Sequence, residues 1–169
     1  MSLNECKVTK VEKRNITIHM VTSPEEGELT IDNVKFQIYK AINAEDNAMM
    51  IIGLPEIKTL LSQDLIYNRT YMYLATKDEN GNLCIDNWIQ YLQDFKTKGY
   101  ETIIPGHGEP ADPSIFDTTI KYLETAKGII ASSNNTEELV KQFTEKYPDY
   151  RIPLILQMTA FMFYEYGKD

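Results

Sequence analysis

The hydrophobic residues of this chain change their spacing along the sequence, from every second residue in the first half to every third or fourth in the second. Alternation places successive side chains on opposite faces of a strand, whereas the wider spacing places them along one face of a helix. The first half is therefore predicted to form strands over 15–21, 29–31, 34–39, 48–52 and 59–61, the last ending near Asp64. The short apolar stretch 48–52 is typical of a buried strand.

The second half is predicted to be mostly helical. Asp86 is placed to cap a helix over 86–98, and a brief strand over 102–104 is stopped by Pro105. Helices are then predicted over 113–132, from Asn135 onward, and over 151–166. The chain is thus predicted to be one partial α/β domain of residues 1–169, with strands in 15–66 and helices in 86–98 and 113–166.

Charge and size narrow the possible partners. The chain has 25 acidic and 17 basic residues and a formal net charge of −8, which argues against binding to nucleic acid or to an anionic membrane. No apolar stretch approaches the ~18 residues that a membrane span needs. Cys6 and Cys84 lie far apart in the sequence and are interpreted as free thiols, which favours a reducing cytoplasm.

A glycine-rich loop displays one of the two histidines of the chain. It follows the strand 102–104 and reads Pro105-Gly106-His107-Gly108. Glycines on both sides of a residue let the backbone bend sharply and approach a ligand closely. Neutral imidazole is a common ligand for zinc and iron, so His107 is a candidate metal ligand, although a lone loop histidine also suits an exposed surface.

A carboxylate, Asp64, follows another short apolar strand. In that place it is suited to meet a metal at the rim of a sheet, but an aspartate there also suits a cap or a turn. The other histidine, His19, falls within the alternating stretch 15–21 and is interpreted as a structural or exposed strand residue.

Together the two candidate segments resemble the metallo-β-lactamase superfamily. In that family a strand ends in Gly-Asp-Leu, whose aspartate bridges two metals, and a later strand ends in Pro-Gly-His-Gly, whose histidine binds the second metal. Here the matching segments stand in the same order and read Gln63-Asp64-Leu65 and Pro105-Gly106-His107-Gly108. The predicted helices between and after them also follow the family's order, and the resemblance covers roughly residues 25–166. The resemblance implies half of a four-layer αββα fold, in which one mainly antiparallel or mixed sheet is flanked by helices. It also implies Asp64 and His107 as metal ligands, for zinc or iron.

The departures from the family pattern concern the rest of the metal site. The family's His-x-His-x-Asp-His motif has no match in this chain, and Gln63 replaces the family's glycine before the aspartate. Glu45 and Asp46 stand near the place of a further family histidine, where they are either substitute oxygen ligands or solvated loop acids. Catalytic zinc usually has three protein ligands, so Asp64 and His107 alone are expected to bind an ion weakly or not at all.

Two functions remain open. The first is the C-terminal portion of a metal-dependent hydrolase, inactive as an isolated chain, whose small-molecule substrate is unknown. The second is a degenerate, non-catalytic module for binding or assembly. Half of a two-sheet fold leaves one sheet face uncovered, so the chain is also expected to form a homodimer that covers this face.

Overall fold

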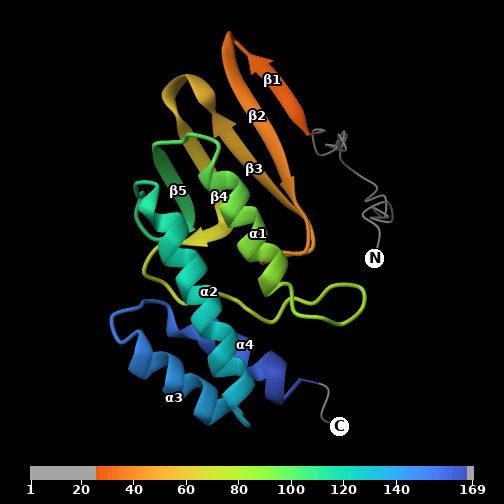
Figure 1. Cartoon of the computed structure of the whole chain (residues 1–169), viewed down its shortest axis with the longest axis vertical. Coiled ribbons are helices and arrows are strands. Elements are labelled where there is room, and N and C mark those ends of the chain that lie inside the picture. Colours follow the sequence, from red (N-terminus) through yellow and green to blue (C-terminus); the bar gives the residue numbers. More distant parts are fainter. Residues whose placement is uncertain (1–25, 167–169) are drawn as a thin grey trace, which may run out of the picture.

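The computed structural model describes residues 26–166, which form one sheet flanked by helices (Figure 1). The strands are β1 (Gly27–Ile31), β2 (Val34–Ala41), β3 (Met49–Leu54), β4 (Thr59–Tyr67) and β5 (Thr102–His107). The helices are α1 (Ile85–Lys96), α2 (Ser114–Ser132), α3 (Thr136–Lys146) and α4 (Pro153–Tyr164), and a short 3-10 turn, η2 (Pro55–Ile57), links β3 to β4. The predicted strand 15–21, together with His19 and Cys6, lies outside the described residues.

The sheet is mixed, as predicted. Its strands lie in chain order, with antiparallel pairs from β1 to β4 and a parallel pair of β4 with β5. The parallel pair requires a crossover connection, and α1 provides it between the two strands. The three helices predicted after His107 are α2, α3 and α4.

All five strands are longer than predicted, and two of them continue past a predicted end. β4 does not end near Asp64 but bends at Gln63, whose φ of 46° is left-handed, and continues to Tyr67. β5 is not stopped by Pro105 and continues to His107. Proline is tolerated there because β5 is an edge strand, so a missing N–H leaves no neighbouring strand without a donor.

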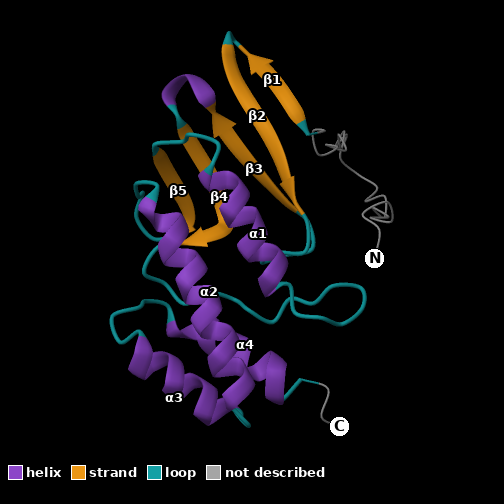
Figure 2. Cartoon of the chain, in the orientation of Figure 1, coloured by secondary structure: helices purple, strands orange, loops and turns teal. Residues whose placement is uncertain are grey.

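Helices α1 and α2 lie over the same face of the sheet, which we call the covered face (Figures 1 and 2). Tyr39 of β2 meets Phe95 of α1 edge-to-face, with ring centroids 5.1 Å apart. The predicted cap Asp86 instead lies inside the first turn of α1, which begins at Ile85, and it pairs with Lys127 of α2. Among the described residues, no helix is both long and apolar enough to cross a bilayer.

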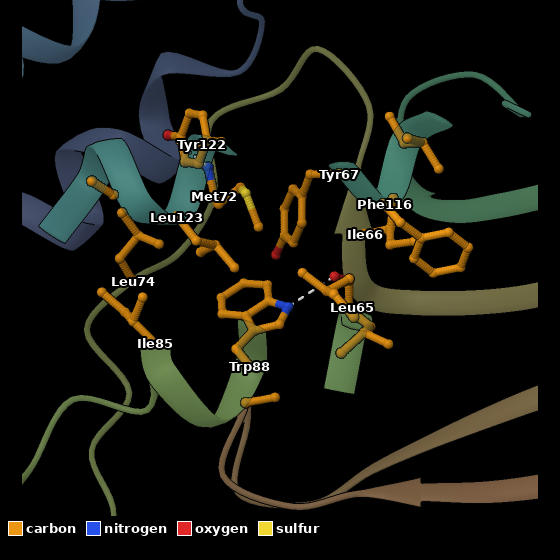
Figure 3. Packing of buried hydrophobic residues seen from close by; sticks show 14 of the residues in the cluster. Leu65, Ile66, Tyr67, Met72, Leu74, Ile85, Trp88, Phe116, Tyr122 and Leu123 are labelled. Atoms are coloured by element: carbon orange, nitrogen blue, oxygen red, sulfur yellow. Dashed lines mark hydrogen bonds between the residues drawn. The ribbon is translucent and has the colours of Figure 1, made fainter. Parts of the chain in front are cut away.

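The core lies between the covered face and these helices. Trp88 of α1 is almost fully buried, and its indole N–H donates to the carbonyl of Leu65 at 2.8 Å (Figure 3). Leu123 and Tyr122 of α2 pack in the same cluster. The indole bond matters because a buried donor without an acceptor is costly, so Trp88 is held in one orientation against β4.

The opposite side of the sheet, which we call the open face, is also apolar. Cross-strand pairs place Ile38 opposite Ile52, Ile52 opposite Leu61, and Leu61 opposite Ile104, so these side chains share one face. Ile38 is buried, whereas Ile52 and Leu61 are only half-buried and Ile104 is exposed. The predicted strand 48–52 is thus buried on the covered face and only half-buried on the open face, because the helices cover β3 from one side only.

Candidate functional site

The two candidate segments meet where β4 bends. A Cβ at Gly106 would overlap the Asp64 carboxylate and the backbone of Gln63, so this close approach requires glycine. Gly108 has a φ of 95° and lies against the backbone carbonyl of Asn68, where a side chain would not fit. Both glycines therefore lie close to other segments of the chain itself, and their close approach to a ligand stays a prediction.

Asp64 and His107 lie together at this rim of the sheet, as predicted. The Asp64 Oδ1 and His107 Nε2 atoms are 3.3 Å apart, and both side chains are partly exposed. The strand register explains the contact. Gln63 pairs with Pro105 and Tyr67 with His107, so the bulged residues 64–66 stand opposite Gly106 alone. The bulge turns Asp64 toward the end of β5.

Two further side chains extend the pair into the protein. Tyr67 stacks on His107, with ring centroids 4.7 Å apart, and its hydroxyl donates to Glu45 Oε1 at 3.4 Å. Sequence reasoning missed Tyr67 because it ended β4 near Asp64. The available signal was that Leu65, Ile66 and Tyr67 continue the apolar stretch after the aspartate.

Glu45 differs from its neighbour Asp46. Asp46 is exposed, as expected for a solvated loop acid, whereas Glu45 is half-buried. Burial, followed by the negative charges of Asp64 and Asp46, raises the pKa of Glu45 to about 7. The interpretation of Glu45 as a solvated loop acid is therefore wrong, and below pH 7 its carboxyl is mostly protonated.

An open pocket of about 300 Å³ lies beside the pair. Its lining residues are Glu45, Asp46, Ala48, Met49, Gln63, Asp64 and Gly106. A larger hollow of about 450 Å³ lies between α2 and α3, but it includes neither candidate ligand. The smaller pocket is therefore the one whose walls carry the candidate chemistry.

The pair fits two positions of one metal ion. Ligands held about 2.1 Å from an ion at the tetrahedral angle lie about 3.4 Å apart, close to the observed 3.3 Å. The same distance suits an ion pair between Asp64 and a protonated His107. Within residues 26–166, no three His, Cys, Asp or Glu side chains are grouped closely enough to hold a metal. The described residues thus fit part of a metal site and not a complete one.

Comparison with known proteins identifies the fold. A metallo-beta-lactamase from Pontibacter korlensis superposes with a TM-score of 0.50 and 16% identity, over 61% of this chain and 47% of that one. A metallo-beta-lactamase family protein from Thermus thermophilus superposes with a TM-score of 0.57 and 14% identity, over 83% of this chain and 47% of that one. No family model and no curated protein sequence matches the chain. The chain spans about half the length of the solved structures it matches.

Proposed function

We propose that this chain, which has part of the metallo-β-lactamase fold, is the C-terminal portion of a metal-dependent hydrolase. In this proposal it contributes Asp64 and His107 to a metal site that it does not complete alone. The supporting observation is the 3.3 Å contact between the two side chains at a glycine-lined bend of the sheet.

The isolated chain is expected to be inactive. A catalytic zinc site usually has three protein ligands and an open position for water or substrate, and the described residues offer two ligands. Glu45 is not grouped closely enough with Asp64 and His107 to be a third ligand, and its Oε1 accepts a hydrogen bond from Tyr67. The remaining ligands are therefore proposed to come from a polypeptide that carries the family's His-x-His-x-Asp-His motif. We place the protein in the cytoplasm, on the argument from its cysteines.

Metal titration of the purified full chain tests the proposal. Calorimetry with Zn²⁺ should show weak binding that falls by at least about tenfold in Asp64→Asn and in His107→Gln, because even residues behind the ligands change metal affinity about 10–100-fold. His19→Gln, which removes the other histidine, and Asp86→Asn, on the surface of α1, are the matched controls and should leave binding unchanged.

A second experiment adds the half of the domain that this chain lacks in the proposal. Adding the separately produced N-terminal half of a metallo-β-lactamase domain should tighten Zn²⁺ binding only when Asp64 and His107 are both intact. Tight, stoichiometric zinc in the isolated chain would contradict the proposal and indicate further ligands, with Glu45 and Asp46 the first to examine. Equal Zn²⁺ binding by the wild type and both site variants would exclude the pair as ligands.

A non-catalytic binding or assembly module is the second candidate. The observation in its favour is the open face, whose Ile104 is exposed although the strands around it are apolar. This candidate predicts that neither site variant changes any binding property of the chain. It also predicts that adding the complementary half restores no hydrolysis.

A further inference from the structure

The imidazole ring of His107 has few contacts that fix its orientation. Its Nε2 atom lies 3.3 Å from Asp64 Oδ1, and the side chain is 35% exposed at the end of β5. Among the described residues, no hydrogen bond reaches the other ring nitrogen, Nδ1. A metal-binding histidine almost always donates from its second ring nitrogen to a carboxylate or a backbone carbonyl, and that bond orients the ring. In this chain a different contact has to orient His107.

The ring of Tyr67 provides that contact. Tyr67 and His107 are register partners at the ends of β4 and β5, and their rings stack with centroids 4.7 Å and planes 26° apart. The backbone supports the same alignment, since the Asn68 N–H donates to the His107 carbonyl at 2.8 Å. Stacked rings favour one relative plane, so the imidazole loses this contact when it rotates about its Cβ–Cγ bond. The plane of the imidazole in turn decides whether Nε2 faces Asp64.

Tyr67 is itself held on more than one side. It is 5% exposed, and its ring lies near that of Trp88, with centroids 6.5 Å apart (Figure 3). Its hydroxyl donates to Glu45 Oε1, and the backbone carbonyl of Glu45 accepts a hydrogen bond from the Thr76 hydroxyl. A side chain packed in a dense core has little freedom to move. Tyr67 is therefore a firm support for the partly exposed ring of His107.

We propose that Tyr67 is a positioning residue for His107 and holds its ring in the plane in which Nε2 faces Asp64. The inference rests on the proposed function, because it gives Tyr67 a role in a metal site. An imidazole that binds a cation becomes electron-poor, and the negatively polarised face of an aromatic ring favours such a partner. Tyr67 thus stabilises the arrangement of the two ligands and does not contact the ion itself.

The aromatic ring carries this role, and the hydroxyl adds little to it. The bond from the hydroxyl to Glu45 Oε1 is 3.4 Å long, beyond the usual range of about 2.5–3.0 Å for O–H···O bonds. Tyr67→Phe should therefore keep the stack, whereas Tyr67→Leu removes it. Phe116→Leu is the matched control, because Phe116 is 1% exposed in the same core cluster but lies on α2.

NMR of the metal-free full chain tests the geometry. The chain has two histidines, so His19→Gln assigns their two sets of imidazole signals. Protons above the face of an aromatic ring are shielded, so the ring protons of His107 should lie upfield of those of free histidine when both imidazoles are neutral. Tyr67→Leu should remove this upfield shift, whereas Tyr67→Phe and Phe116→Leu should keep it.

A Zn²⁺ titration followed at the same signals tests the role. Tyr67→Leu should raise the dissociation constant for Zn²⁺ about tenfold, because residues behind metal ligands change the affinity about 10–100-fold. Tyr67→Phe loses only a long hydrogen bond and should change the constant by less than about threefold. Phe116→Leu should leave it unchanged.

Failure of the positioning role and failure of the metal role give different results. If His107→Gln leaves Zn²⁺ binding unchanged, the metal role is wrong and the positioning role is wrong with it. If His107→Gln weakens binding and Tyr67→Leu does not, only the positioning role is wrong. Equal weakening by Tyr67→Leu and Phe116→Leu would also overturn it, since the cause would then be a general loosening of the fold.

Circular dichroism of each variant separates loss of the stack from loss of the fold. If Tyr67→Leu does not fold, Tyr67→Met takes its place, because methionine keeps a long apolar side chain without a ring. The wild type decides the geometry in either case. Ring protons of His107 that are not shielded in the wild type would show that the two rings do not stack in solution, which would overturn the proposal.

Discussion

In the central strands β3, β4 and β5, neighbouring apolar residues on the covered face and the open face lie in different environments. Ile103 and Ile104 are neighbours in β5, yet Ile103 is fully buried under the helices and Ile104 is 37% exposed. The same holds for Ile51 and Ile52 in β3 and for Leu60 and Leu61 in β4. The comparison shows that one apolar face builds the core of this chain, while the other remains partly exposed.

The largest expected effect comes from truncating the buried member of the neighbouring pair Ile103 and Ile104. Ile103→Ala should lower the free energy of unfolding by about 3 kcal/mol, because it removes buried methyl groups and leaves a cavity against the helices. Ile104→Ala should cost less than about 1 kcal/mol in the monomer. Urea unfolding at 1 μM compares the two. Equal losses would show that the open face is covered within the chain itself.

A glycine on the covered face gives the next largest effect. A Cβ at Gly53 would overlap the Tyr100 hydroxyl, so Gly53→Ala should lower the free energy of unfolding by about 1–3 kcal/mol. Gly128→Ala in α2 is the matched control, since open space surrounds that position and alanine favours the helix. Gly128→Ala should raise the melting temperature, whereas Gly53→Ala should lower it. A stable Gly53→Ala variant would indicate that the contact between β3 and Tyr100 is loose.

At the rim, where the two faces meet, the expected effect depends on pH. Folded Glu45 keeps its proton up to about pH 7, whereas the unfolded carboxyl has a pKa of 4.5. The folded state therefore binds more protons between these values, and its stability falls as the pH rises from about 4.5 to about 7. After allowance for solvent screening, the loss should be about 1–2 kcal/mol.

Thermal melts of the wild type and Glu45→Gln between pH 4 and 8 measure this effect. Glu45→Gln should flatten the dependence, while Asp46→Asn, in the same loop but exposed, should keep it. A wild-type melting temperature that rises between pH 4.5 and 7 would mean that the ionised form of Glu45 is the one that the fold stabilises.

The smallest expected effect concerns the bend of β4. Gln63 has a left-handed φ of 46°, a conformation that costs a residue with a side chain about 1–2 kcal/mol and costs glycine little. Gln63→Gly should remove this cost, but it also raises the conformational entropy of the unfolded chain. The free energy of unfolding is therefore expected to rise by only about 0.5 kcal/mol. Gln63→Ala keeps the left-handed cost and should show no gain in urea unfolding. Destabilisation by Gln63→Gly would mean that the glutamine side chain stabilises the bend.

Much of the candidate site was predictable because its two segments resemble an ordered pair of motifs in a known family, although Asp64 and His107 stand 43 residues apart. The glycines on either side of His107 indicate a close approach wherever they occur, and that approach brings Asp64 to the histidine. Tyr67 and Glu45 were not assigned in this way. Their contact joins residues 22 positions apart and depends on β4 continuing past the bend at Gln63.

The sequence by itself determined the element types and their order, because two-residue and helical periodicities are properties of each segment alone. Only the tertiary structure decided which apolar face is covered, since Ile103 and Ile104 are identical until α1 and α2 pack against one side of the sheet. It also decided that Glu45 holds its proton near neutral pH, because desolvation and neighbouring charges arise only when distant segments meet. Burial depends on how the whole chain packs. A periodic pattern predicts only that a segment has an apolar face, not which other segment packs against it.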